Sequence, residues 1–277
     1  MNIADLAWAG STALIVLAVW VETMTDLVRP DRWRRRLHDL AGGALLAVAS
    51  LPAAFVAAIV ARSVWPVLSR TAPSTVAAAT DHPLLGFVVA FIVWDALGWV
   101  DHWIGHRTRI GWVTHRPHHG GSSFNLTLAL RQSPYPLAGI ALLPLVALTG
   151  VPFETAAIAV AVSNTWQAMV HTQARLPLPG WLEKAVMTPA THEVHHDHGG
   201  VVNLGPVLTL WDRAAGTYCA PPGHPHEPRH HDCRFGTGVP GGGQARHYGC
   251  PPCPRSPRPT PRPSSHPTDC PSPANAR

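Results

Sequence analysis

Charged side chains are scarce in this chain. Asp, Glu, Lys and Arg make up 13% of its 277 residues, whereas apolar types make up 46%. A soluble domain usually carries about 25% charged residues. So few charges do not cover a whole protein surface, which disfavours an ordinary soluble protein. We therefore expect much of the surface to face lipid rather than water.

Cysteine is absent from the apolar part of the chain. All five cysteines come at or after its end, as Cys219, Cys233, Cys250, Cys253 and Cys270. Their position excludes a disulfide framework, a thiolate metal site and a cysteine nucleophile from the apolar part. The CxxC formed by Cys250 and Cys253 stands among prolines, without the second pair that frames a zinc site.

The excess of basic residues does not indicate nucleic-acid binding. The formal net charge is +5, and arginines gather beside the apolar stretches, most densely between Arg29 and Arg36. The positive-inside rule places such clusters on the cytoplasmic side of membrane helices. The sequence therefore predicts a membrane as partner and no nucleic acid.

Four apolar stretches stand out, at about residues 6–21, 41–61, 84–100 and 137–170. A helix needs about 20 apolar residues to cross a bilayer, so each of the first three predicts one span. The fourth is too long for one span, and Gly150 to Pro152 form a natural corner within it. We expect a helical hairpin there, and an all-α, multi-pass transmembrane helical bundle as a whole. Stretches this long and this poor in charge disfavour a buried soluble core.

The orientation of these spans follows from the basic cluster. The first stretch lacks the basic leader of a signal peptide, and the cluster between Arg29 and Arg36 follows it instead. We therefore expect an uncleaved helix whose N-terminus lies outside. Counting spans from there places His102, His171 and His192 on the cytoplasmic side. The sequence predicts a protein of the cell membrane with its histidines at one face.

Histidine is abundant, with 18 residues, and the informative ones form three motifs. These are an HxxxH at His102 and His106, an HxxHH at His115, His118 and His119, and another HxxHH at His192, His195 and His196. Positions i, i+3 and i+4 of a helix share one face, so each motif can direct its imidazoles at one point. Neutral imidazole binds Fe, Zn, Cu or Ni, and eight such ligands suit two neighbouring ions better than one.

Polar residues on the apolar stretches accompany these motifs. Asp95 precedes His102 by two helical turns, and a carboxylate inside an apolar helix is usually functional. It can accept the second ring N–H of a ligand histidine, or it can form a hydrogen bond in helix packing. Asn164, Gln167 and His171 form a similar stripe, in which His171 is either a ninth ligand or a supporting group.

From about Asp95 to Tyr218 the chain resembles the fatty acid hydroxylase/sterol desaturase superfamily of membrane histidine-rich di-iron oxygenases. Within it, the bacterial branch similar to alkylglycerol monooxygenase is nearest. The likeness rests on the order of the three motifs and on the residues around them, which are Trp112, Asn125, Arg131, a QxxxHT at 167–172, an NxG at 203–205 and a WDRxxGT at 211–217.

The resemblance implies that the eight motif histidines hold two iron ions, and that O2 is used to hydroxylate a lipid or alkyl chain. Zinc is an alternative metal, because imidazole binds both. Electrons would come from a separate reductase, ferredoxin or cytochrome, since the sequence has no flavin, haem or iron–sulfur motif. Further ligands or supporting residues are expected at His171, Asp95, Gln167, Asn125, Arg131 and Asp212.

The chain divides into three expected regions. Residues 1–83 form N-terminal transmembrane helices, and residues 84–219 form the hydroxylase-like catalytic region, with its histidine-rich di-metal cap on the cytoplasmic side. From about Ala220 Pro, His, Arg, Gly and Cys dominate. Such a segment does not bury enough surface to offset its ordering entropy, so residues 220–277 are expected to be disordered.

Three other functions share parts of this pattern. A lipid or sterol desaturase needs the same metal site and differs only in its product. A metal-binding or transport protein predicts ionisable residues along a path through the bilayer, whereas here only Asp95 lies well inside a span. A metal-free structural membrane protein predicts that replacing His118 and His119 by Ala changes neither metal content nor activity.

Overall fold

The computed structural model describes residues 2–27, 33–131, 141–174, 178–198 and 201–221. Over these residues the regular secondary structure is helical, apart from an isolated antiparallel bridge between Val186 and Leu208. The prediction of an all-α fold is confirmed. The expected disordered tail lies outside the described residues from position 222 onward, and so do the four cysteines that follow Cys219.

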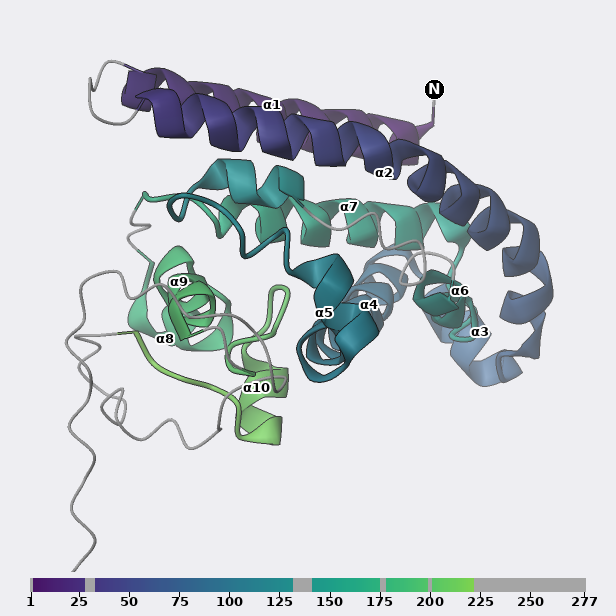
Figure 1. Ribbon diagram of the computed structural model, residues 1–277. Coiled ribbons are helices and arrows are strands. Elements are labelled where there is room, and N and C mark those ends of the chain that lie inside the picture. Colours follow the sequence, from purple (N-terminus) through teal and green to yellow (C-terminus); the bar gives the residue numbers. More distant parts are fainter. Residues whose placement is uncertain (1, 28–32, 132–140, 175–177, 199–200, 222–277) are drawn as a thin grey trace, which may run out of the picture. The chain divides into compact units, whose positions relative to one another are not determined.

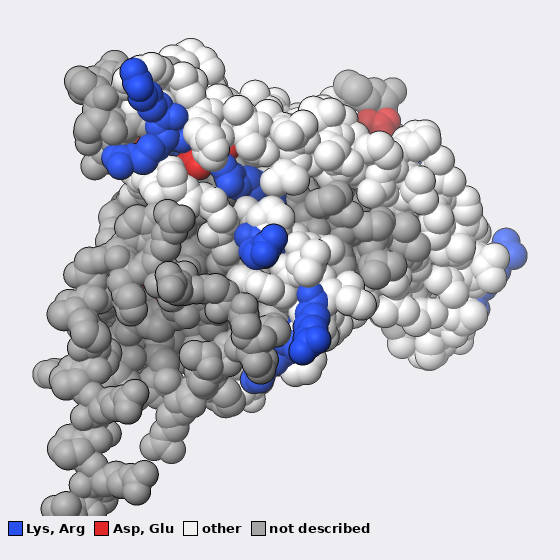
Figure 2. Space-filling view, in the orientation of Figure 1, with Lys and Arg blue, Asp and Glu red and all other residues white. Residues whose placement is uncertain are grey.

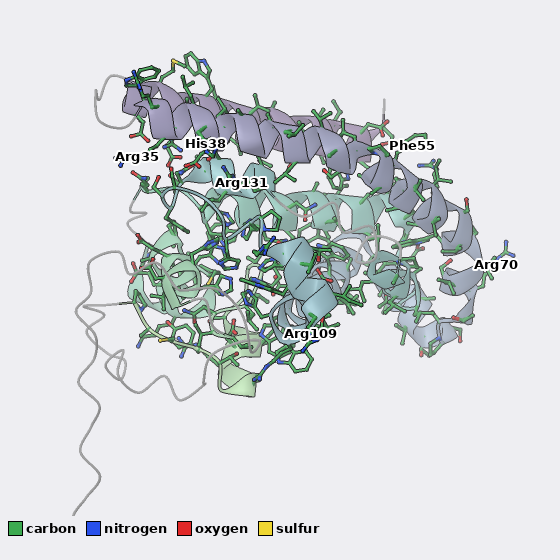
Figure 3. The ribbon with its side chains drawn as sticks, in the orientation of Figure 1. Arg35, His38, Phe55, Arg70, Arg109 and Arg131 are labelled. Atoms are coloured by element: carbon green, nitrogen blue, oxygen red, sulfur yellow. The ribbon has the colours of Figure 1, made fainter. Side chains whose placement is uncertain are left out.

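Within the described residues, three helices are long and apolar enough to cross a membrane. They are α1 (Ile3–Leu27), α2 (Trp33–Leu68) and α4 (Pro83–Arg107), and they contain the first three apolar stretches of the sequence. Large apolar side chains project from them, such as Phe55, which is 68% exposed and points away from α2 in Figure 3. Lys and Arg appear near the two ends of α2, and the surface between them is largely uncharged (Figure 2). These helices confirm the multi-pass prediction.

The fourth apolar stretch differs from its prediction. The turn lies where it was expected: Gly150 has a φ of +77°, and α7 (Phe153–Met169) starts directly after Pro152. The first arm, however, contains only the five-residue helix α6 (Leu143–Ala147) as an α-helix in the described part. With 17 residues, α7 is shorter than the length of about 20 that a span needs. The described residues therefore do not form a hairpin of two full spans.

A helical core joins these elements. Helix α7 packs against α1 and α4, and α2 packs against α6 and the 3₁₀ helix η2 (Leu126–Arg131). The Trp65 indole N–H donates to the carbonyl of Val151 over 2.9 Å, which fixes α2 to the turn before α7. A Cβ at Gly43 would lie 3.0 Å from the Thr127 carbonyl oxygen, so a glycine allows the close approach of α2 and η2.

Short helices complete the described part. They are η1 (Ser69–Thr71), α3 (Ser74–Thr80), α5 (Arg109–His115), α8 (Gly180–Ala185), α9 (Pro189–His198) and α10 (Leu210–Ala215). In Figure 1, α5 runs beside the end of α4, as their contacts require. Cys219, after α10, is buried and disulfide-bonded. The helices α4, α5, α7 and α9 bring the histidine motifs together.

Candidate metal centre

The three histidine motifs and His171 come from four different parts of the fold. The first lies on the last two turns of α4, and the third lies on α9, as their helical spacing predicts. The second differs from the helical expectation, because α5 ends at His115 and the chain continues through turns at His118 and His119. His171 lies in the turn that follows α7.

In the part of the chain that the structure describes, nine histidines form two groups, in each of which one ring nitrogen per residue lies within 4.8 Å of the others. The first group contains His102, His106, His115, His119 and His195. The second group contains His118, His171, His192 and His196. His171 thus stands among the motif histidines, where spacing alone left its role open.

Four nitrogens of the first group form a closed ring. The Nε2 atoms of His102, His115, His119 and His195 follow one another at 3.1, 3.1, 3.2 and 3.1 Å around it. In the second group, Nε2 of His171 lies 3.1 Å from Nε2 of His118 and 3.0 Å from Nε2 of His192. The imidazoles of each group therefore converge through the same ring atom.

Backbone carbonyls fix the tautomer of four of these rings. The Nδ1–H of His102 donates to Leu204 over 2.9 Å, and that of His195 donates to Val202 over 2.8 Å. A carbonyl only accepts, so Nδ1 carries the proton of a neutral ring and Nε2 is left with a lone pair. The Nε2 atoms of His102 and His195 therefore face each other at 3.1 Å with no proton between them.

The second group repeats this arrangement. The Nδ1–H of His118 donates to Leu128 over 3.0 Å, and that of His171 donates to Gln167 over 2.9 Å. Their Nε2 atoms are again 3.1 Å apart. Two opposed lone pairs repel each other unless a cation lies between them, so each group has the donor set of a metal site.

Protonation of the rings does not relieve this repulsion. Burial lowers the pKa of His118 and His195 well below the usual value of histidine, and nearby imidazoles lower it further. Burial also lowers the pKa of His171 to about 4. The rings are therefore neutral near pH 7, which is the form that binds metal ions.

Unpartnered nitrogens point to the same conclusion. Among the described residues, His106 Nε2 and His196 Nε2 are buried without a hydrogen-bond partner. A buried polar atom usually has a partner, because leaving it without one costs about 1–3 kcal/mol. A pair of metal ions fits this donor set, since each ion would occupy several lone pairs at once.

Asp95 accepts no hydrogen bond from an imidazole of the described residues, so it does not have the first of its two expected roles, which was to orient a ligand histidine. Its carboxylate accepts hydrogen bonds from the backbone N–H groups of Val207 and Leu208, at 2.8 and 3.1 Å, and from the Trp211 indole at 2.8 Å. It therefore fixes the segment before α10 to α4. This matches the helix-packing alternative.

Asp212 fixes the other half of that segment. It is fully buried and accepts hydrogen bonds from the N–H groups of Leu204 and Gly205, at 2.9 and 2.7 Å, and from the Trp99 indole at 3.1 Å. Because the carbonyl of Leu204 holds the His102 ring, Asp212 positions that ring through the backbone.

Three other expected residues also support the site from a distance. The Gln167 side chain donates to Ser163 Oγ over 3.1 Å, and only its backbone carbonyl meets a histidine. Asn125 accepts from the N–H of Thr127 at 2.9 Å and thereby shapes the start of η2. Arg131 donates to the carbonyl of Gly120, over 3.1 Å, in the loop after the second motif.

Two carboxylates from the N-terminal helices were missed by the sequence reasoning. Glu22 of α1 accepts from the N–H of Leu126 at 2.7 Å and from that of Gln173 at 3.1 Å. Asp39 of α2 accepts from the N–H of Ser122 at 3.1 Å and from Arg131, labelled beneath α2 in Figure 3, at 3.0 Å. The sequence feature that could have revealed them is a carboxylate at the edge of an apolar helix, which is also how Asp95 was found.

A cavity of about 630 Å³ leads from the histidines to the apolar helices. One wall includes His102, His118 and His171. Another part of the lining comes from α1 and α2 and consists mainly of small residues, among them Ala54 and Ala57. Small side chains on these helices leave open space that reaches the histidines.

Comparison with known proteins agrees with this geometry. A sequence model described as fatty acid hydroxylase matches residues 87–217, which contain all nine histidines. Alkylglycerol monooxygenase of Homo sapiens is 32% identical over 122 residues, 42% of this chain and 27% of the human protein. That of Danio rerio is 32% identical over 135 residues, 47% of this chain and 30% of the fish protein.

The chain thus spans under a third of the length of these relatives. No solved structure matches it. The matched segment carries the complete set of histidine motifs in the expected order, and it folds so that their rings converge. Through residues 87–217, the chain is thus similar to the fatty acid hydroxylase family, which supports its resemblance to the fatty acid hydroxylase/sterol desaturase superfamily.

Proposed function

We propose that this protein is a membrane di-iron oxygenase that hydroxylates a lipid or alkyl chain. The observation that carries the proposal is the pair of buried imidazole groups whose lone pairs oppose each other at the end of an apolar cavity. The name alkylglycerol monooxygenase of the relatives and the family description both favour hydroxylation over desaturation. Alkylglycerols are accordingly among the first lipids to test.

Each imidazole group would hold one ion. The five histidines of the first group, among them His102 and His195, would hold one ion. The four histidines of the second group, among them His118 and His171, would hold the other. Bound iron supplies the activation of O2 for insertion of one oxygen atom into a C–H bond, with electrons from an external donor. Imidazole accepts zinc as well, so zinc in a purified sample would not contradict the site.

The protein's own residues position and shield the reaction. The Nδ1 hydrogen bonds hold four of the rings in one tautomer and one orientation, which keeps their Nε2 lone pairs directed toward the other imidazoles. The small residues of α2 leave a channel that an alkyl chain fills, and a filled channel excludes water from the centre. A substrate chain would therefore reach the histidines from the membrane-facing helices.

The contacts of α2 support a cytoplasmic location for the centre. Asp39 contacts Ser122 three residues after the second histidine motif, and it follows the arginine cluster by only three residues. In Figure 3, Arg35 and His38 are labelled in the same corner of the view as Arg131. If the arginine cluster obeys the positive-inside rule, the loops that follow the second histidine motif lie on the same side of the membrane as that cluster. A reductase, ferredoxin or cytochrome of the cytoplasm would then reach them.

Metal analysis and isotope labelling test the proposal together. The full chain is purified in detergent and reconstituted with Fe(II), and its iron and zinc contents are measured. It is then incubated with alkylglycerols and other lipids, a reductant and ¹⁸O2. Iron in the protein and one ¹⁸O atom in an alcohol product are expected. A product that lacks two hydrogens and carries no label would instead establish a desaturase, and absence of both iron and product would refute the proposal.

A further inference from the structure

A second carboxylate of α4, Asp101, faces the cavity. It lines the cavity beside His102, on the same helical face as Trp94, Gly98 and Gly105. Asp101 is partly buried. Its oxygens do not belong to either group of convergent ligand atoms, so the imidazoles do not account for its presence.

Asp101 differs from the other acidic residues near the centre. Asp95 and Asp212 each receive at least three hydrogen bonds. Within the described part of the chain, no hydrogen bond or ion pair reaches the Asp101 carboxylate. Its oxygens are not among the buried unpartnered atoms of the described residues, so they are open to the cavity, where a donor group of a ligand can reach them.

The charge of the cavity wall limits the class of ligand that can bind beside Asp101. Among its described lining residues, Asp101 is the one carboxylate, and none is Lys or Arg. A lipid whose carboxylate or phosphate group lies against Asp101 would be repelled there, and no Lys or Arg in the described lining offsets that repulsion. The ions proposed at the histidines would attract such a group toward themselves and away from Asp101. A hydroxyl group can donate to the carboxylate without introducing a charge into the apolar cavity.

We propose that Asp101 is a specificity-determining residue for an uncharged, hydroxyl-bearing lipid, an assignment that rests on the proposed function. Its carboxylate accepts a hydrogen bond from a hydroxyl of the substrate, while the alkyl chain lies along the small residues of α2 in the same cavity. Free fatty acids are discriminated against by the same carboxylate. The residue thus selects the polar group of the substrate, and the cavity holds its chain.

A binding experiment with matched ligands tests this assignment. The iron-reconstituted full chain is placed in nanodiscs, and radiolabelled hexadecanol is displaced by hexadecane, hexadecanoic acid or hexadecylamine, which differ only in their polar group. Wild type is expected to bind hexadecanol roughly tenfold or more tightly than hexadecane, as a hydrogen bond to a charged acceptor allows. Equal binding of hexadecanol and hexadecanoic acid, or tighter binding of hexadecylamine, would overturn the proposal.

Two variants of Asp101 and one control sharpen the test. Asp101→Leu should reduce hexadecanol affinity to that of hexadecane, and the nearly isosteric Asp101→Asn should raise hexadecanoic acid affinity because the negative charge is removed. Asp81→Leu, which removes an exposed carboxylate that does not line the cavity, should change neither. Unchanged ligand preference in Asp101→Asn would overturn the assignment even if Asp101→Leu fails to fold.

Oxidation is measured separately on the same samples. A preference for hexadecanol that depends on Asp101, without oxidation of any lipid, would refute the proposed oxygenase and leave the assignment of Asp101 standing. Oxidation of fatty acids and alcohols at equal KM in wild type and Asp101→Asn would refute the assignment alone.

Discussion

The Nδ1 atoms decide how the histidine rings of this protein face one another. Where a backbone carbonyl takes the Nδ1 proton, as at His102 and His171, Nε2 turns inward as an acceptor. Opposed acceptors at 3.1 Å require a cation, whatever the family of the protein. The contribution of each ring is therefore testable one residue at a time.

His171 gives the sharpest prediction at this scale, because its ring lies outside the three motifs. His171→Ala removes the imidazole that stands 3.1 Å from His118 and 3.0 Å from His192. We expect the iron content to fall from about two ions per chain toward about one, because the second group loses one of its four ligands. Iron per chain is measured after reconstitution.

An exposed histidine provides the control for this change. His82→Ala, at the start of α4, should keep the full iron content, because His82 is exposed and belongs to neither group. Full iron content in His171→Ala would show that His171 is not a ligand.

Motif spacing was enough to point to the eight motif histidines, but a single shared helical face does not describe their arrangement. His118 and His119 lie in turns, and each HxxHH motif divides its rings between the two groups. Motif spacing also did not reveal how the rings are held. Leu204, which accepts from His102, lies 102 residues away in the sequence, and no local pattern links such positions. The same limit applies to Asp95, whose donors are Val207, Leu208 and Trp211.

At the scale of elements, α1 and α2 do more than anchor the chain. Through Glu22 and Asp39 they receive hydrogen bonds from the loops that follow the second motif and His171. Both carboxylates are largely buried, and Arg36 pairs with Glu22 at 3.4 Å and also with Asp26. The apolar helices therefore carry the polar groups that hold the histidine loops in place.

A double-mutant cycle at Asp39 and Arg131 tests this coupling. Each single change to Ala leaves a buried partner without its ion pair, so each should lower the thermal unfolding midpoint and the iron content. The double variant should be less destabilised than the sum of the two, with a coupling of at least about 1 kcal/mol. Additive effects would show that the pair does not hold the loop.

Element prediction succeeded where one physical signal dominated. Long apolar runs were sufficient to identify α1, α2 and α4, because lipid-facing helices need little else in their sequence. The region around α6 was less predictable, because its apolar residues pack against α2 and α4 within the described part instead of forming one long helix. Composition does not distinguish these two uses of an apolar residue.

At the scale of the whole molecule, the cavity connects the apolar helices to the imidazole groups. Its α2 wall is made of small side chains, whereas the opposite face of the same helix exposes large ones such as Phe55. One helix thus offers space for a chain on one face and contact with lipid on the other.

Filling that space should select against long chains. Ala57→Phe adds a ring to the cavity wall at a residue that is 7% exposed, so we expect several-fold lower turnover of long-chain lipids and smaller losses for short ones. Unchanged iron content would show that the fold persists. The control Phe55→Ala lies on the exposed face and should leave chain-length preference intact. Equal loss at every chain length would contradict a substrate channel at this wall.

Iron K-edge X-ray absorption on the reconstituted full chain, together with its iron content, tests the central claim most directly. The account predicts two ions per chain, one for each histidine group, with an imidazole-dominated nitrogen environment that weakens in His171→Ala. A single ion, or scattering dominated by sulfur or carboxylate ligands, would contradict it.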